Sequence, residues 1–128
     1  MSYYFSKILN VSFDEAISRV TEELKKEGFG ILTDIDVKET LKKKLNMDFQ
    51  KYRILGACNP PFAYKSLQVE DKIGLMLPCN VVVQQISEGK IEVAAIDPVA
   101  SMQAIDNPKL RDVAEQVRGK LKSVINSL

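Results

Sequence analysis

Two cysteines are the residues of this chain whose type and surroundings could do chemistry. They lie in the segments Ala57–Pro61 (Ala-Cys-Asn-Pro-Pro) and Leu77–Asn80 (Leu-Pro-Cys-Asn). A thiolate is a nucleophile and a ligand for soft metal ions. The chain of 128 residues has no other cysteine and no histidine. Cysteine or serine catalysis assisted by a histidine base is therefore excluded.

Cys58 precedes a sequence that is typical of a helix start. Asn59 is a good N-cap residue, and proline is common at the first helical position, here Pro60. Free N–H groups and the positive end of the helix dipole would favour a thiolate, lower the pKa of Cys58 from about 8.5, and attract an anion. The same residues also make a good helix start without any function, and free cysteines are often buried, so a purely structural role stays open for Cys58 and Cys79.

A metal site is the less favoured interpretation of the two cysteines. Thiolates suit Cu(I) or Zn(II), but the spacing is not that of a Cys-x-x-Cys motif. Zinc would need carboxylates such as Asp97 or ligands from a second subunit. We therefore predict no metal site, and nothing in the sequence identifies a cofactor.

The charge pattern argues against a nucleic acid or a membrane as partner. The formal net charge is +1, and the lysine clusters at 25–26 and 42–44 have glutamates nearby on the same expected helices. No apolar run is long enough to cross a bilayer, and the first residues do not resemble a secretory signal. We expect a cytoplasmic protein, in which the two cysteines are free thiols.

Alternating apolar segments and helical periodicity predict an α+β fold. The expected strands are 3–9, 29–37, 49–57, 73–86 (interrupted at Pro78) and 91–96, and the expected helices are 13–27, 37–45, a short one from 60, a short turn or helix near 99–105, and 108–126. We therefore expect a single domain over 1–128, with an antiparallel-rich sheet of about five strands covered by helices.

Local signals fix both ends of the first of these helices. Ser12 and Glu15 form a capping box before the first helix, and Gly28 suits the left-handed position after it. The short helix 37–45 is expected to turn Val37, Leu41 and Leu45 inward.

At several motifs the chain resembles the bacterial and archaeal family called domain of unknown function 302. The resemblance covers about 12–98, outside the C-terminal helix 108–126, and its motifs are Ser12–Ala16, Glu27–Gly30, Tyr52–Pro60, Ala63 and Ile73–Val81. It implies a compact α+β fold and a homodimer, but no established activity. It also favours one common site for Cys58, Asn59, Pro60 and Cys79.

The leading hypothesis is a homodimer that binds a small molecule or an anion at a pocket formed by Cys58, Asn59, Pro60, Cys79 and Asn80. One alternative is a thiol-based redox enzyme or sensor, with Cys58 as the reactive thiolate and Cys79 as its resolving partner. Another is a non-catalytic interaction module that uses an exposed strand edge. Whether the chain is an enzyme stays open.

Overall fold

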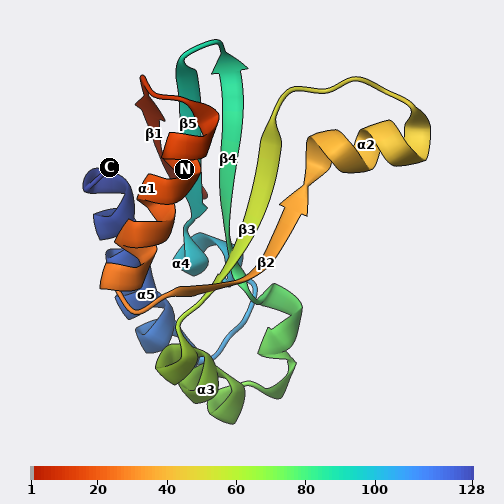
Figure 1. Ribbon diagram of the computed structural model, residues 1–128. Helices are drawn as coiled ribbons and strands as arrows, with labels where there is room; N and C mark the ends of the chain where they lie inside the picture. The colour runs from red at the N-terminus through yellow and green to blue at the C-terminus, as the bar shows by residue number, and fades with distance from the viewer. Residues whose placement is uncertain (1) are drawn as a thin grey trace.

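The computed structural model describes residues 2–128 and consists of one five-stranded antiparallel sheet with helices packed on one face (Figure 1). The strand order is β1-β5-β4-β3-β2. The strands are β1 (Tyr4–Leu9), β2 (Gly30–Asp36), β3 (Tyr52–Cys58), β4 (Cys79–Ser87) and β5 (Lys90–Ile96). The helices are α1 (Phe13–Lys26), α2 (Val37–Leu45), α3 (Pro60–Val69), the 3-10 helix η1 (Asp71–Met76), α4 (Pro98–Ser101) and α5 (Pro108–Asn126). The predicted α+β class is confirmed.

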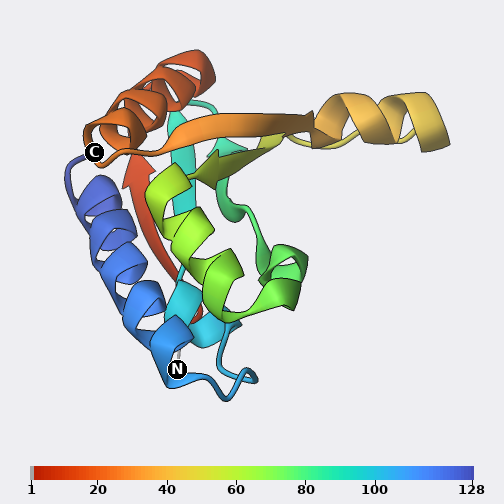
Figure 2. The same ribbon diagram turned by 90° about the horizontal axis from the view of Figure 1, so that it is seen from below.

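The main core lies between the sheet and the two long helices α1 and α5 (Figure 2). Helix α5 turns its apolar face to this core and to a smaller adjoining cluster, and alternate residues of the central strands point the same way. The fully buried side chains include Val20, Leu24, Leu55, Val81, Val83, Ile91, Val93 and Leu121. No helix within residues 2–128 is long and apolar enough to cross a membrane.

Helix α1 begins and ends where its sequence signals indicate. The Ser12 side chain accepts a hydrogen bond from the Glu15 N–H at 3.2 Å. At the other end Gly28 has a φ of +87°, and the Phe29 N–H donates to the Leu24 carbonyl at 2.9 Å. These are the bonds of a Schellman motif, which turns the chain from α1 directly into β2.

The predicted strand over 73–86 is wrong in its first half. Residues 71–76 form η1, with Ile73 buried and Leu75 85% exposed, whereas a strand would place both side chains on one face. β4 starts only at Cys79, directly after Pro78, which has no N–H to donate to a sheet ladder. The peptide bond between Leu77 and Pro78 is cis.

Helix α2 forms as predicted, but its apolar residues do not point inward. None of its residues is buried, and Leu45 is 65% exposed. The reason is its position, because α2 projects from the end of β2, away from the other helices (Figures 1 and 2). Its amphipathic pattern therefore has no core to face.

Gly56 marks the closest approach of three segments. A β-carbon at this position would lie 2.1 Å from Thr33 Oγ1 in β2 and 2.7 Å from Pro78 Cγ just before β4. Only glycine fits without displacing one of them. The turn of chain from Leu77 into β4 therefore sits directly against β3.

We predict that Gly56→Ala destabilises the fold by about 1–3 kcal/mol, because the added methyl group must push Thr33 or Pro78 aside. Gly119→Ala is the matched control: it lies on the exposed side of α5, where nothing is within 4 Å of the new methyl group. That change should stabilise the protein by up to about 1 kcal/mol. Urea unfolding measures both. Equal stability of Gly56→Ala and the parent chain would contradict this explanation.

Candidate ligand-binding cavity

A cavity of about 320 Å³ lies between the end of the sheet and the helices α3, α4 and α5. Its volume is near the lower limit of the usual range for small-molecule sites, about 300–1,000 Å³. Leu32 and Leu67 contribute to its lining and are 70% and 46% exposed, so the mouth opens between β2 and α3. The other lining residues are Phe29, Ala57, Cys58, Asn59, Phe62, Ala63, Ser66, Leu77, Pro78, Cys79, Pro98, Met102, Val113, Ala114 and Val117.

Both cysteines line this cavity, from neighbouring strands. Cys79 is directly opposite Ala57 in the β3–β4 ladder, so it is one register position from Cys58. Ladder geometry then sets the two α-carbons about 6 Å apart. Both thiols are free; Cys58 is half-buried and Cys79 is 8% exposed. Burial, together with the nearby Cys58, raises the pKa of Cys79 to about 11.

Asn59 precedes α3 as expected, but its side chain does not cap the helix. Its Nδ2 instead donates to the Glu27 carbonyl at 3.1 Å, which ties the start of α3 to the end of α1. Pro60 and Pro61 have no N–H, and the Ala63 N–H bonds to the Asn59 carbonyl at 2.9 Å. At this helix start neither the Asn59 N–H nor the Phe62 N–H is bonded to an acceptor within residues 2–128.

The lining of the cavity is almost entirely apolar. Within the described residues no charged side chain contributes to it, and its one hydroxyl, on Ser66, donates to the Phe62 carbonyl at 2.8 Å. No group of three or more histidine, cysteine, aspartate and glutamate side chains within residues 2–128 gathers at metal-binding distance. The environment favours a neutral, apolar guest over an ion.

Two residues of the expected site lie outside the cavity lining. Pro60 is exposed at the first turn of α3. Asn80 pairs with Gly56 in the β3–β4 ladder, so its side chain points to the face of the sheet opposite that of Cys79. There it borders a shallow hollow with Val82 and Tyr4.

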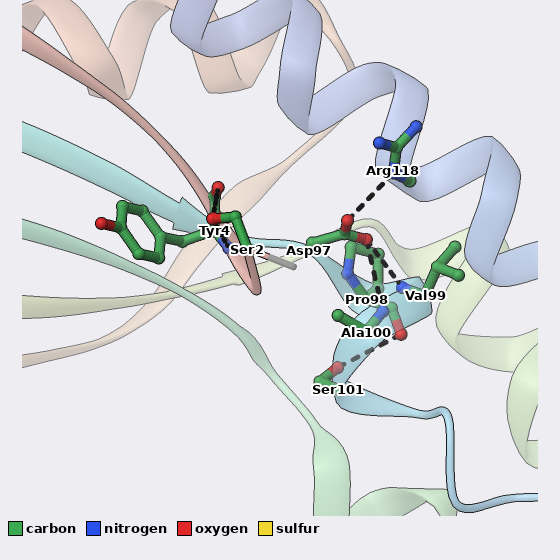
Figure 3. A network of polar contacts seen from close by, with 8 residues as sticks. All are labelled: Ser2, Tyr4, Asp97, Pro98, Val99, Ala100, Ser101 and Arg118. Atoms are coloured by element: carbon green, nitrogen blue, oxygen red, sulfur yellow. Dashed lines mark hydrogen bonds and ion pairs between the residues drawn. The ribbon is translucent and has the colours of Figure 1, made fainter.

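A buried carboxylate holds α4 in place as one wall of the cavity (Figure 3). Asp97 caps α4 by accepting from the Val99 and Ala100 N–H groups at 3.0 and 3.4 Å. Its other oxygen accepts from Arg118 Nε of α5 at 3.0 Å. The Asp97 side chain thus joins α4 to α5, and both helices contribute lining residues.

Sequence reasoning did not find most of the cavity wall. None of Phe62, Ala63, Leu67, Val113 and Val117 was among the expected site residues. All five line the cavity. No signal in the periodicity could separate these positions, because an apolar wall and an apolar core have the same pattern.

Comparison with known proteins places the chain in a family. The model of the family described as domain of unknown function DUF302 matches residues 5–128. The chain belongs to the DUF302 family. It is also similar to a solved structure, the uncharacterized conserved protein DUF302 from Bacillus stearothermophilus, with 29% sequence identity, a TM-score of 0.90 and 98% of each chain covered. Comparison with curated proteins gave no match.

The raised pKa of Cys79 predicts a loss of stability in alkaline solution. In the unfolded chain this thiol ionises near pH 9.0, but in the DUF302 fold it stays neutral up to about pH 11. Its contribution to stability is therefore complete below pH 9 and is lost as the pH rises to 11. The difference in unfolding free energy between the parent chain and Cys79→Ala should shrink across this interval, as measured by urea unfolding. A difference independent of pH would contradict the burial of a neutral thiol, and Cys58→Ala is the matched control.

Proposed function

We propose that this DUF302 chain binds a small, apolar, neutral molecule in the cavity beside Cys58 and Cys79. The observation that carries the proposal is an open cavity of about 320 Å³ whose lining includes both thiols and no charged side chain of the described residues. Binding there would remove apolar surface from water, on the ligand and on the wall, at about 25 cal/mol per Å².

The same cavity gives less support to an anion. An anion at the start of α3 would need several backbone N–H donors or a cationic side chain. Pro60 and Pro61 remove two of those donors, and the lining holds no lysine or arginine within residues 2–128. An anion would lose its hydration there without gaining a cationic partner.

The thiol-redox alternative has support in geometry but not in reactivity. Cys58 and Cys79 lie one register position apart on neighbouring strands, and both line the cavity. A resolving cysteine, however, attacks as a thiolate. With a pKa near 11, Cys79 is almost entirely protonated at neutral pH, so we rank this function below ligand binding. The two free thiols also support a reducing compartment, and we propose the cytoplasm.

A neutral fluorescent dye tests the binding of apolar molecules. N-phenylnaphthylamine should bind saturably, with a rise in fluorescence, because the cavity excludes water from its rings. Ala63→Phe should weaken this binding at least about tenfold by occupying the space. Gln68→Phe, which adds the same ring to an exposed position of α3 outside the cavity, should leave it unchanged. Equal dye affinity of the parent chain and Ala63→Phe would refute the proposed site.

We also propose that the chain forms a homodimer through the face of the sheet that α1 and α5 leave uncovered, called here the open face. Strand register and alternation place on this face Tyr4, Ser6, Ile8, Thr33, Ile35, Tyr52, Ile54, Asn80, Val82, Gln84, Glu92, Ala94 and Ile96. Ile8 and Ile35 are about half exposed, at 52% and 48%. An uncovered sheet face with so many apolar side chains is typical of an interface.

A second copy suits the open face because the face carries few charges, Glu92 and, at the start of β5, Lys90. Its one carboxylate, Glu92, accepts from Gln84 Nε2 at 2.9 Å, and Gln84 in turn accepts from Gln50 at 2.8 Å. Two such faces can therefore meet about a twofold axis without repulsion between like charges. Family resemblance implies the same oligomeric state.

We predict that Val82→Lys converts the dimer to a monomer, because two lysines would be buried opposite each other at the centre of the open face. Sedimentation velocity measures the change in mass. Gln116→Lys, on the exposed side of α5, is the control and should sediment like the parent chain. A parent chain that is already monomeric at high concentration would overturn the dimer.

A further inference from the structure

We propose that the segment 37–51, called here the arm, packs against the second copy in the dimer. The arm consists of α2 and the chain that returns from it to β3. The inference rests on the proposed dimer and adds the arm to the surface that the two copies share. Three observations support it: the exposure of the arm, its connection to the open face, and the area that a dimer needs.

The arm has a defined structure but no core of its own. Val37 and Leu41 are half-buried, and every other residue from 38 to 51 is exposed. Helix α2 is nevertheless capped at both ends, by the Asp36 side chain, which accepts a backbone N–H at 3.0 Å, and by Asn46 in the left-handed conformation. A helix of nine residues is too short to be stable alone in water, so its apolar side needs a cover.

The exposed side chains near the tip of the arm are apolar. Leu45, Met47 and Phe49 are 65%, 58% and 40% exposed. Large apolar side chains gathered at the surface are typical of an interface.

The lysines of the arm are partly paired within it. Lys42 and Lys43 form ion pairs with Asp48 and Glu39, at 3.1 and 2.7 Å. This pairing favours a protein surface over an anionic membrane as the partner of the arm.

The arm is continuous with the open face. The rings of Phe49 in the arm and Tyr52 on the open face lie 6.1 Å apart, and Gln50 Nε2 donates to Gln84 Oε1 at 2.8 Å. Ile35, also on the open face, directly precedes the cap of α2 and is 48% exposed. Figure 2 shows α2 beyond the β2 edge of the sheet, on the side away from α1 and α5. A second copy on the open face is therefore in position to contact the arm.

The area of the open face explains why a dimer would use the arm. Five strands at about 4.8 Å each, over a shared length of about six residues, give the face about 480 Å² as a flat surface. A standard interface buries about 800 Å² on each partner. Helix α2 adds about 140 Å², since nine residues extend about 14 Å and a helix is about 10 Å wide. In a twofold dimer each copy gives one arm and receives one beyond its own open face, so each gains about twice that area.

Two substitutions in the arm test the proposal by sedimentation equilibrium. Leu45→Gln combined with Met47→Gln should raise the dissociation constant of the dimer at least about tenfold, because two apolar side chains that the second copy would cover become polar. Both positions are exposed in the single chain, so urea unfolding of the monomer should be unchanged. Lys43→Gln places the same side chain on the opposite side of α2, and this control should change the constant less than about twofold.

A photo-cross-link identifies the chain that the arm contacts. A chain labelled with 15N carries p-benzoylphenylalanine in place of Leu45. It is diluted together with unlabelled parent chain to allow subunit exchange, then concentrated and irradiated. Mass spectrometry should find the labelled arm joined to unlabelled peptides.

The outcomes separate this inference from the proposed dimer. If Val82→Lys abolishes the dimer but the double variant dimerises as tightly as the parent chain, or the arm joins only labelled peptides, the arm contact is refuted while the open-face dimer stands. If the double variant instead loses only affinity for phosphatidylserine vesicles, a membrane covers the arm and the proposal is overturned. If the parent chain is monomeric at high concentration, the dimer and the arm contact both fail.

Discussion

The absence of a side chain at Gly56 is the constraint on which the candidate site depends. Thr33 and Pro78 both occupy space that a β-carbon would take, so β2, β3 and the entrance to β4 can converge only around glycine. The next pair in the same ladder is Ala57 and Cys79, and Cys58 follows directly. The contact that closes this end of the sheet thus also sets where both thiols enter the cavity. A substitution at Gly56 would therefore lower the stability of the fold and displace the cavity residues at the same time.

The cavity exists because many of its lining side chains are small, whereas large side chains fill the rest of the core. Alanine, serine and cysteine supply much of its wall, at Ala57, Ala63, Ser66, Cys79 and Ala114. Elsewhere leucine, isoleucine and valine close the space between the sheet and the two long helices. Protein interiors pack densely, and leaving such space open costs stability. Small side chains from four separate segments leave this space open, and Asp97 and Arg118 fix α4 as one of its walls.

Much of the fold could be predicted from the sequence because its signals are local. The cap at Ser12, the turn at Gly28 and the apolar face of α5 each depend on a few neighbouring residues. The errors occurred where tertiary context decides. The apolar run from Ile73 suited a strand but formed η1, and the amphipathic α2 has no core to cover. The cavity could not be predicted beyond its two cysteine motifs, since its other residues come from segments that the sequence does not place together.

The two cysteine motifs look alike in the sequence, yet the fold gives their thiols different chemistry. At neutral pH Cys79, with its pKa near 11, is a small apolar group that happens to contain sulfur. Cys58 is half-buried at a helix start whose own cap residue bonds elsewhere. An alanine could line the cavity as well as Cys79 does. The Cys79 sulfur therefore matters only if the neighbouring thiol or a ligand contacts it. The proposed site therefore depends on both thiols, the neutral Cys79 and the more exposed Cys58, which line the same apolar cavity.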